Sequence, residues 1–202
     1  MSKTIFIIGG IGSGKSTLTH YFAQQGVPTL DLDQVGHEVL KSDAAKNALV
    51  KEFGEDILDA DGSIVRSALA AKAFVSSAAT KRLTAITAPL IVESMKEWAQ
   101  GFSPQKHPFV IVEVSAYDGP QGAYGHLATD LIAVTAPVDV RIMRASKNGF
   151  NKQDLLRRIE RQASDEQRRS WARYLIENDG DQAELKRKLD ILWEELQNAY
   201  AS

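Results

Sequence analysis

A short apolar run that leads into a glycine-rich stretch constrains the fold of this 202-residue chain more than any other feature. Ile5–Ile8 is rich in β-branched residues and ends at glycine, which indicates a buried parallel strand. Lys15–Gln25 follows as a predicted helix that stops at Gly26. Between strand and helix the pattern G-x-x-x-x-G-K-[ST] is matched in full by Gly9, Gly14, Lys15 and Ser16.

This glycine pattern is typical of a loop that binds phosphate. The glycines let backbone N–H groups turn inward around phosphate oxygens, and the helix presents its positive end to them. We expect Lys15 to reach the β- and γ-phosphates and the Ser16 hydroxyl to bind Mg²⁺. A glycine-rich turn with a solvated lysine is the alternative. The predicted nucleotide-binding residues of the loop are Gly10, Ile11, Gly12, Ser13, Gly14, Lys15, Ser16 and Thr17.

Strands and helices alternate along the rest of the chain. Further strands are predicted at Val27–Leu32, Phe109–Val114, Leu131–Thr135 and Tyr174–Ile176. Residues 34–99 are mostly helical in pattern, with a break at Pro89, and the regions 152–173 and 182–200 are also predicted to be helical. This order predicts an α/β fold, a three-layer, doubly wound parallel sheet with a helical insert. In such sheets ligands bind beyond the carboxyl ends of the strands.

Two carboxylates stand at the end of the second predicted strand. Asp31 and Asp33 are separated by one residue, so in an extended strand both side chains point to one face. There they could hold Mg²⁺-bound water or accept a proton from an attacking hydroxyl. Alternatively, Asp33 caps a helix that begins at Gln34.

Arginines are concentrated in the region between residues 141 and 173. Arg141 and Arg144 lie three apart on a predicted helix that begins at Pro137, and several more arginines flank Ser164. Phosphoryl transfer needs cations around the moving group, and a mobile segment that carries arginine can close over it. A solvated helix face with ion pairs to neighbouring acids is the alternative, and Arg144 is the best-placed candidate.

Composition excludes several classes of protein. The chain has no cysteine, so disulfides and thiolate chemistry are excluded, and its four histidines lack the spacing of a zinc site. The formal net charge of -2 argues against a nucleic-acid binder. No apolar run approaches the roughly 18 residues that span a membrane. We expect a cytoplasmic protein that acts on a small molecule, as a monomer or small homo-oligomer.

Several segments together resemble the dephospho-coenzyme A kinase family. The loop GGIGSGKST is followed by GVPTLDLDQVGHEVL, as in the opening of these kinases. Within FGEDILDADGSIVRSALAAKAF, the family pattern G-x-[IL]-x-R-x-x-L-x-x-x-x-F is matched by Gly62, Arg66, Leu69 and Phe74. Arg158-Ile159 with Gln162 resembles R-I-x-x-Q, and YLIENDG resembles a later family segment. The resemblance covers nearly the whole chain and is closest over about the first 75 residues.

The resemblance implies a P-loop kinase that transfers phosphate from ATP, with Mg²⁺, to the ribose 3′-hydroxyl of dephospho-coenzyme A. It implies a single domain, 1–202, with a core of 1–33 and 105–202, a helical substrate-binding insert at about 34–104 and a short lid at about 144–160. Asp33 matches the base, with Lys15 and Arg144 as the other catalytic residues. Asn178 and Arg144 match ATP-binding residues, Asp31, Asp33 and Arg66 match the substrate side, and Ser16 and Asp31 match the metal side.

Two departures from the family concern the acceptor side. Ala88 replaces the usual histidine before Pro89, and VEVSAYDGP stands where a strand normally ends in P-L-L-[FIL]-E, with Glu113 inside the strand. They keep open a related small-molecule kinase with a different hydroxyl acceptor. A nucleotide-binding regulatory protein or GTPase-like switch is a third possibility, but the long helical insert over residues 34–99 is typical of a subdomain that holds an acceptor.

Overall fold

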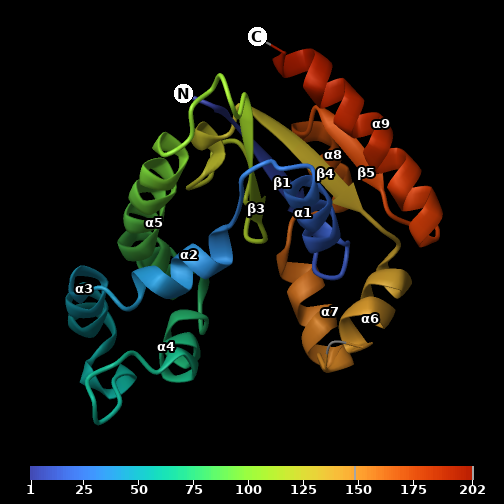
Figure 1. Cartoon of the computed structure of the whole chain (residues 1–202). Helices are drawn as coiled ribbons and strands as arrows, with labels where there is room; N and C mark the ends of the chain where they lie inside the picture. The colour runs from blue at the N-terminus through green and yellow to red at the C-terminus, as the bar shows by residue number, and fades with distance from the viewer. Residues whose placement is uncertain (148, 202) are drawn as a thin grey trace. The chain divides into compact units, whose positions relative to one another are not determined.

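The fold is an α/β structure built on one parallel sheet (Figure 1), seen in a computed structural model that describes residues 1–147 and 149–201. The sheet has the order β2-β3-β1-β4-β5, and every pair of neighbours is parallel. The strands are β1 (Lys3–Gly9), β2 (Thr29–Asp31), β3 (Phe109–Val114), β4 (Asp130–Thr135) and β5 (Tyr174–Glu177). The predicted doubly wound parallel sheet is therefore confirmed.

The chain divides into two compact units, which are described separately. The first comprises Met1–Asp31 and the chain from Ala99 onward, and it contains the sheet. Its helices are α1 (Lys15–Gln24), the 3-10 helix η2 (Gly125–Leu127), α6 (Val138–Lys147), α7 (Lys152–Arg161), α8 (Asp165–Trp171) and α9 (Gln182–Tyr200). The second unit, Leu32–Trp98, contains α2 (Leu32–Val39), α3 (Asp43–Phe53), the 3-10 helix η1 (Glu55–Ile57), α4 (Arg66–Ala73) and most of α5 (Ser77–Gln100).

Helices cover both faces of the sheet because β1 alternates between them. Ile5 and Ile7 are fully buried in one cluster with apolar residues of α1 and α9, among them Phe22 and Leu189. Phe6 points to the other face, where its ring meets Tyr117 edge to face at 6.2 Å. Tyr117 in turn contacts Trp171 of α8 at 5.7 Å. Burial on both faces explains why the run Ile5–Ile8 is continuously apolar.

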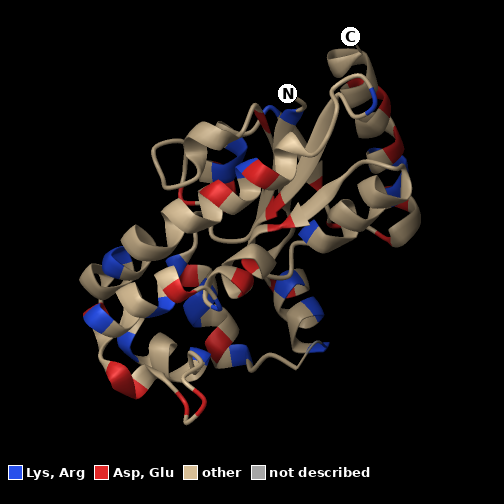
Figure 2. Ribbon diagram, turned by 60° about the vertical axis from the view of Figure 1, so that its left-hand side comes forward, with Lys and Arg blue, Asp and Glu red and all other residues tan. Residues whose placement is uncertain are grey.

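Charged residues are interspersed on the helices rather than separated by sign (Figure 2). On α9, Lys188 and Glu184 are 2.9 Å apart and Lys186 and Asp190 are 2.7 Å apart. These exposed pairs at helical spacing stabilise the fold little, so apolar burial carries most of the stability. No helix in the described part of the chain is both long and apolar enough to cross a membrane.

Three predicted element boundaries are wrong. The second strand ends at Asp31, because α2 begins at Leu32. Pro89 does not break its helix and lies inside the continuous α5, although it has no N–H to donate to the preceding turn. The predicted helix over residues 152–173 is two helices, because the Ser164 side chain caps α8 in a reciprocal capping box with Gln167.

Tyr200, at the end of α9, contacts the sheet through its hydroxyl and its ring. The Tyr200 hydroxyl donates to Asp130 at the start of β4, and its ring packs on Phe109. Burial and this bond to Asp130 raise the pKa of Tyr200 above its usual value. The neutral phenol is therefore the form that the folded state favours.

Tyr200→Phe is expected to lower the free energy of unfolding at pH 7 by about 1 kcal/mol, because one hydrogen bond is lost. The wild type should also lose stability as the pH rises above about 10, since the unfolded state releases the tyrosine proton first. That loss should be smaller in the variant. Urea unfolding at pH 7 and pH 10.5 measures both effects, and an identical fall in the two proteins would contradict the assignment.

Candidate active site

The glycine loop joins β1 to α1 and has a backbone that only glycine adopts readily. Gly12 and Gly14 have φ angles of 75° and 103°, in the left-handed region. A Cβ on Gly9 would lie 2.5 Å from Ser13 Oγ and 2.6 Å from the Val134 carbonyl, so that position also excludes a side chain. Lys15 begins α1 and is only 7% exposed, which is unusual for a lysine. Ser16 and Thr17 follow in the first turn and are exposed.

Two side chains from the second half of the chain hold the peptide groups of Ile11. Gln162 Oε1 accepts a hydrogen bond from the Ile11 N–H at 3.0 Å. Arg141 Nε donates to the Ile11 carbonyl at 2.9 Å. The loop is therefore bound on both sides of one residue, by α6 and by the residue that follows α7.

Arg141 is itself held in a buried group of charges. It is 4% exposed, and its Nη1 lies 3.7 Å from Asp165 Oδ1. Arg168, also buried, approaches the same oxygen at 2.7 Å. Burial lowers the pKa of both guanidinium groups, and the charge of Asp165 opposes this shift. The two buried cations share one carboxylate, so loss of Asp165 would leave both without an acidic partner and would destabilise the fold.

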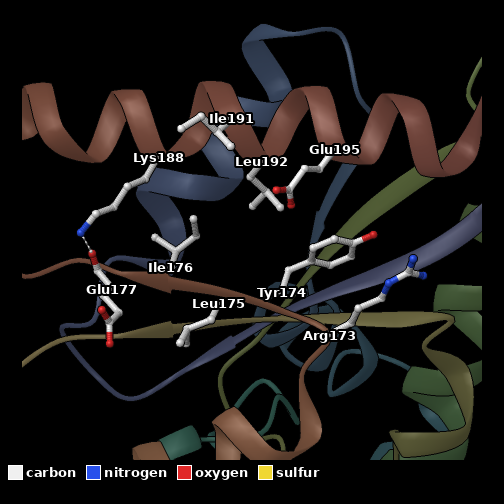
Figure 3. A pocket seen from close by; sticks show the side chains of 9 residues that line it. All are labelled: Arg173, Tyr174, Leu175, Ile176, Glu177, Lys188, Ile191, Leu192 and Glu195. Atoms are coloured by element: carbon white, nitrogen blue, oxygen red, sulfur yellow. Dashed lines mark hydrogen bonds between the residues drawn. The ribbon is translucent and has the colours of Figure 1, made fainter.

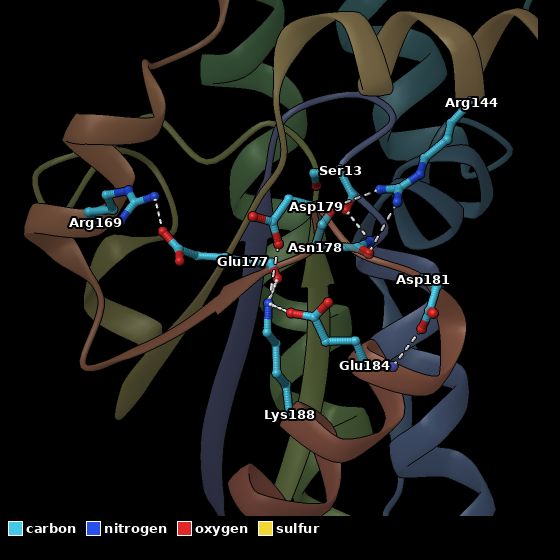
Figure 4. A network of polar contacts seen from close by, with 9 residues as sticks. All are labelled: Ser13, Arg144, Arg169, Glu177, Asn178, Asp179, Asp181, Glu184 and Lys188. Atoms are coloured by element: carbon cyan, nitrogen blue, oxygen red, sulfur yellow. Dashed lines mark hydrogen bonds and ion pairs between the residues drawn. The ribbon is translucent and has the colours of Figure 1, made fainter.

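Asn178 connects the loop to the segment after β5, as Figure 4 shows. Its Nδ2 donates to the Ser13 carbonyl at 2.8 Å, and the residue is 5% exposed. Arg144 donates to both the carbonyl and Oδ1 of Asn178, at 3.0 and 3.2 Å. A cavity of about 150 Å³ adjoins this group, lined by Gly14, Thr17, Arg144, Asn178, Gly180, Asp181, Gln182 and Leu185.

The structure places the two predicted carboxylates on different elements. Asp31 is the last residue of β2 and pairs in register with Glu113 of β3. Glu113 accepts a hydrogen bond from Thr19 Oγ1 of α1 at 2.9 Å, so this end of the sheet faces the helix that follows the loop. Asp33 is exposed in the first turn of α2, in the second unit. The expectation that both side chains share the face of one strand is therefore wrong.

The departures on the predicted acceptor side are packing positions. Ala88 is 7% exposed within α5. Tyr117, which lies in the segment Val114–Pro120, fills the space between Phe6 and Trp171.

Arg66, predicted on the substrate side, is the first residue of α4 and is exposed. Within the described residues, no group of three histidine or acidic side chains converges on a possible metal position.

A separate cavity of about 360 Å³ lies between β5 and α9 and contains no predicted site residue (Figure 3). Leu175 and Ile191, which line it, are exposed by 41% and 60%. Lys188 Nζ of α9 donates a hydrogen bond to the Glu177 carbonyl at 2.6 Å. That carbonyl belongs to β5, an edge strand of the sheet, so one of its exposed acceptors is satisfied. We assign this cavity no role in the site at the loop.

The family model that describes dephospho-CoA kinases matches residues 3–184. The chain belongs to the dephospho-CoA kinase family. This confirms the family predicted from the loop and the later segments.

Two curated relatives show how far the similarity extends. A dephospho-CoA kinase of Latilactobacillus sakei is 34% identical, and the alignment covers 96% of this chain and 96% of that protein. One of Mycolicibacterium paratuberculosis is 39% identical over 95% of this chain. Because this chain spans only 46% of the mycobacterial protein, the latter is about twice as long.

Two solved structures show how closely the fold is matched. The Thermus thermophilus protein TT1252 has a TM-score of 0.81 and 28% identity, with 96% of this chain and 98% of that chain covered. Dephospho-CoA kinase from Campylobacter jejuni, with a TM-score of 0.72 and 22% identity over 98% and 99% of the two chains, shares the fold. The P-loop kinase architecture predicted from the sequence is thus confirmed.

Sequence reasoning identified Gln162 only as part of a family pattern, and it left Arg141 open between a contact to phosphate and a place on a solvated helix face. The structure buries Arg141 and Arg168 and brings Gln162 to the loop. The family pattern R-I-x-x-Q marks Gln162 in the sequence, but it does not indicate that Gln162 contacts the glycine loop. No local pattern distinguishes the buried arginines from the exposed ones on the same helices.

Proposed function

We propose that this protein catalyses the transfer of the γ-phosphoryl group of ATP to the ribose 3′-hydroxyl of dephospho-coenzyme A, which gives coenzyme A and ADP. The match to the family model across residues 3–184 carries this proposal, because it includes both compact units. The complete glycine loop supports it independently, since that loop is suited to hold the donor phosphates.

On the donor side, we propose that Gly10–Thr17 binds the phosphates of ATP, with the Lys15 ammonium on the β- and γ-phosphates. The fit is supported by buried polar atoms at the loop. Ser13 Oγ and Arg141 Nη2 have no hydrogen-bond partner among residues 1–147 and 149–201, so the site has capacity left for an anion. The cavity beside Asn178 is suited to part of the nucleoside, and Arg144 would contact phosphate after leaving Asn178.

The proposed metal is Mg²⁺, with Ser16 and Asp31 on its side of the site. Mg²⁺ usually keeps several waters and takes few protein ligands besides substrate phosphates, which agrees with the exposed Ser16 hydroxyl and with the lack of a three-ligand cluster among the described residues. When bound, it neutralises charge on the transferring phosphates.

On the acceptor side, we propose that Asp33 takes the proton of the 3′-hydroxyl while that oxygen forms its bond to the γ-phosphorus and the bond to the β-phosphate oxygen breaks. Asp31, in the core, and Arg66, within an insert at about residues 34–104, would bind the substrate. The chain from about 144 to 160 would form the lid, and residue 148 of that range lies outside the described residues. We place the reaction in the cytoplasm, where ATP is available, with a monomer or small homo-oligomer as its form.

Incubation with Mg·ATP and dephospho-coenzyme A tests the proposal directly. We expect coenzyme A as the product by mass, in a one-to-one ratio with ADP. Adenosine, which offers a ribose hydroxyl without the pantetheine arm, is the control acceptor and should be turned over far more slowly. ATP binding without coenzyme A formation would overturn the proposed acceptor and favour a related kinase.

A further inference from the structure

Both peptide groups of Ile11, in the glycine loop, are bonded by side chains from the second half of the chain. Its N–H donates to Gln162 Oε1 at 3.0 Å, and its carbonyl accepts from Arg141 Nε at 2.9 Å. Both bonds are partly buried, and they span 151 and 130 residues of sequence. The orientation of the peptides on either side of Ile11 is thus set by tertiary contacts.

The loop packs closely against Arg141. A Cβ on Gly10 would lie 2.0 Å from Arg141 Nη2, and one on Gly12 would lie 2.4 Å from the Arg141 carbonyl. The loop therefore packs directly against Arg141, whose Nη1 lies 3.7 Å from Asp165 Oδ1. The bond from the Ile11 N–H to Gln162 is the second side-chain contact at this residue.

We propose that Gln162 is a positioning residue for the donor nucleotide. Its side chain acts on the loop and has no proposed contact with ATP. It holds the Ile11 peptide so that the inward-facing N–H groups of the following residues are already arranged when the phosphates arrive. The inference rests on the proposed function, since it assumes that the loop binds ATP. Without the Gln162 bond, the loop would become ordered only when the nucleotide binds. The entropic cost of that ordering would lower the affinity for the nucleotide.

The same bond ties the arginine-bearing helix to the loop. Gln162 is the C-cap residue of α7, and its backbone N–H is bonded to the Arg158 and Ile159 carbonyls. The end of α7 is therefore fixed relative to Ile11, whereas its other end follows a turn at Gly149 with φ 85°. Loss of the bond should loosen the loop and the end of α7 together.

Hydrogen exchange of the nucleotide-free protein measures the bond without requiring any activity. In Gln162→Ala, exchange in a peptide covering the loop should be faster than in the wild type by roughly threefold to tenfold, as expected for one lost hydrogen bond. Affinity for a non-hydrolysable ATP analogue, measured by calorimetry, should fall by a similar factor. The KM of the acceptor should stay unchanged. Gln197→Ala is the control, because Gln197 is an exposed glutamine of α9, outside the glycine loop and the proposed lid.

Gln162→Glu separates positioning from general destabilisation. Its carboxylate keeps an oxygen that accepts from the Ile11 N–H, so loop protection should return to the wild-type value in the glutamate variant and not in the alanine variant. Wild-type exchange and affinity in Gln162→Ala would overturn the proposal, as would faster exchange with unchanged affinity. A wild-type protein that binds no ATP analogue would instead overturn the proposed function.

Discussion

Asp33→Asn is expected to lower kcat by roughly 10²- to 10⁴-fold, the range for loss of a general base. Asparagine has nearly the same shape as aspartate but cannot take the proton of the attacking hydroxyl. Affinity for ATP should change by less than about twofold, because the proposed role does not involve the donor phosphates. Steady-state kinetics with both substrates, together with calorimetry for ATP, separates the two quantities.

A second variant, Asp43→Asn, distinguishes a catalytic role of Asp33 from a purely structural role at the start of a helix. Asp33 lies in the first turn of α2, where a negative charge stabilises the helix dipole by about 0.3–1 kcal/mol. Asp43 occupies the first turn of α3 in the same unit and is also exposed. Asp43→Asn should therefore reproduce the small loss of stability with full turnover. Normal turnover in Asp33→Asn would leave Asp33 with the structural role alone.

Lys15→Met is expected to weaken ATP binding and to lower kcat by roughly 10²- to 10³-fold, as for other charged groups that stabilise the transition state. Methionine is preferred to alanine here because the lysine stem is buried, and a Cβ on Gly9 would lie 3.1 Å from its Cγ. The variant should thus keep the packing of the loop and lose only the ammonium group.

Lys3→Met provides the comparison, since Lys3 is exposed at the opposite end of β1. It should show wild-type affinity and turnover. Unchanged kinetics in Lys15→Met would refute the phosphate role of the lysine. A fall in melting temperature that accompanies the kinetic loss would indicate damage to the loop instead, so thermal unfolding of both variants belongs to the experiment.

The parts of the fold that depend on local pattern could be predicted from the sequence. Phe109–Val114 is continuously apolar because both faces of β3 are covered, and its predicted bounds equal the observed ones. The loop at Gly9–Ser16 was recognisable because its chemistry needs glycine at set positions and a lysine at one of them. The bounds of α9, Gln182–Tyr200, were equally clear from its amphipathic pattern.

Other features depend on contacts that no local pattern records. Asp31 and Asp33 look alike in sequence, yet the helix start at Leu32 gives them different elements. Arg141 and Arg144 lie three apart on α6, yet one is buried beneath the loop and the other bonds to Asn178. The surroundings of these arginines depend on how α6 and α8 pack against the sheet. That packing is made by residues far apart in the sequence, so no local pattern predicts it.

The glycine loop is held by residues far away in the sequence, which determines when it can become ordered during synthesis of the chain. The loop leaves the ribosome before Arg141, Gln162 and Asn178, the residues that hold it, which follow 130 to 165 residues later. A nascent chain therefore displays the glycines long before it can keep them in place. Since a ligand stabilises only a state that binds it, ATP cannot assist the early stages of folding and can only reinforce a domain that is nearly complete.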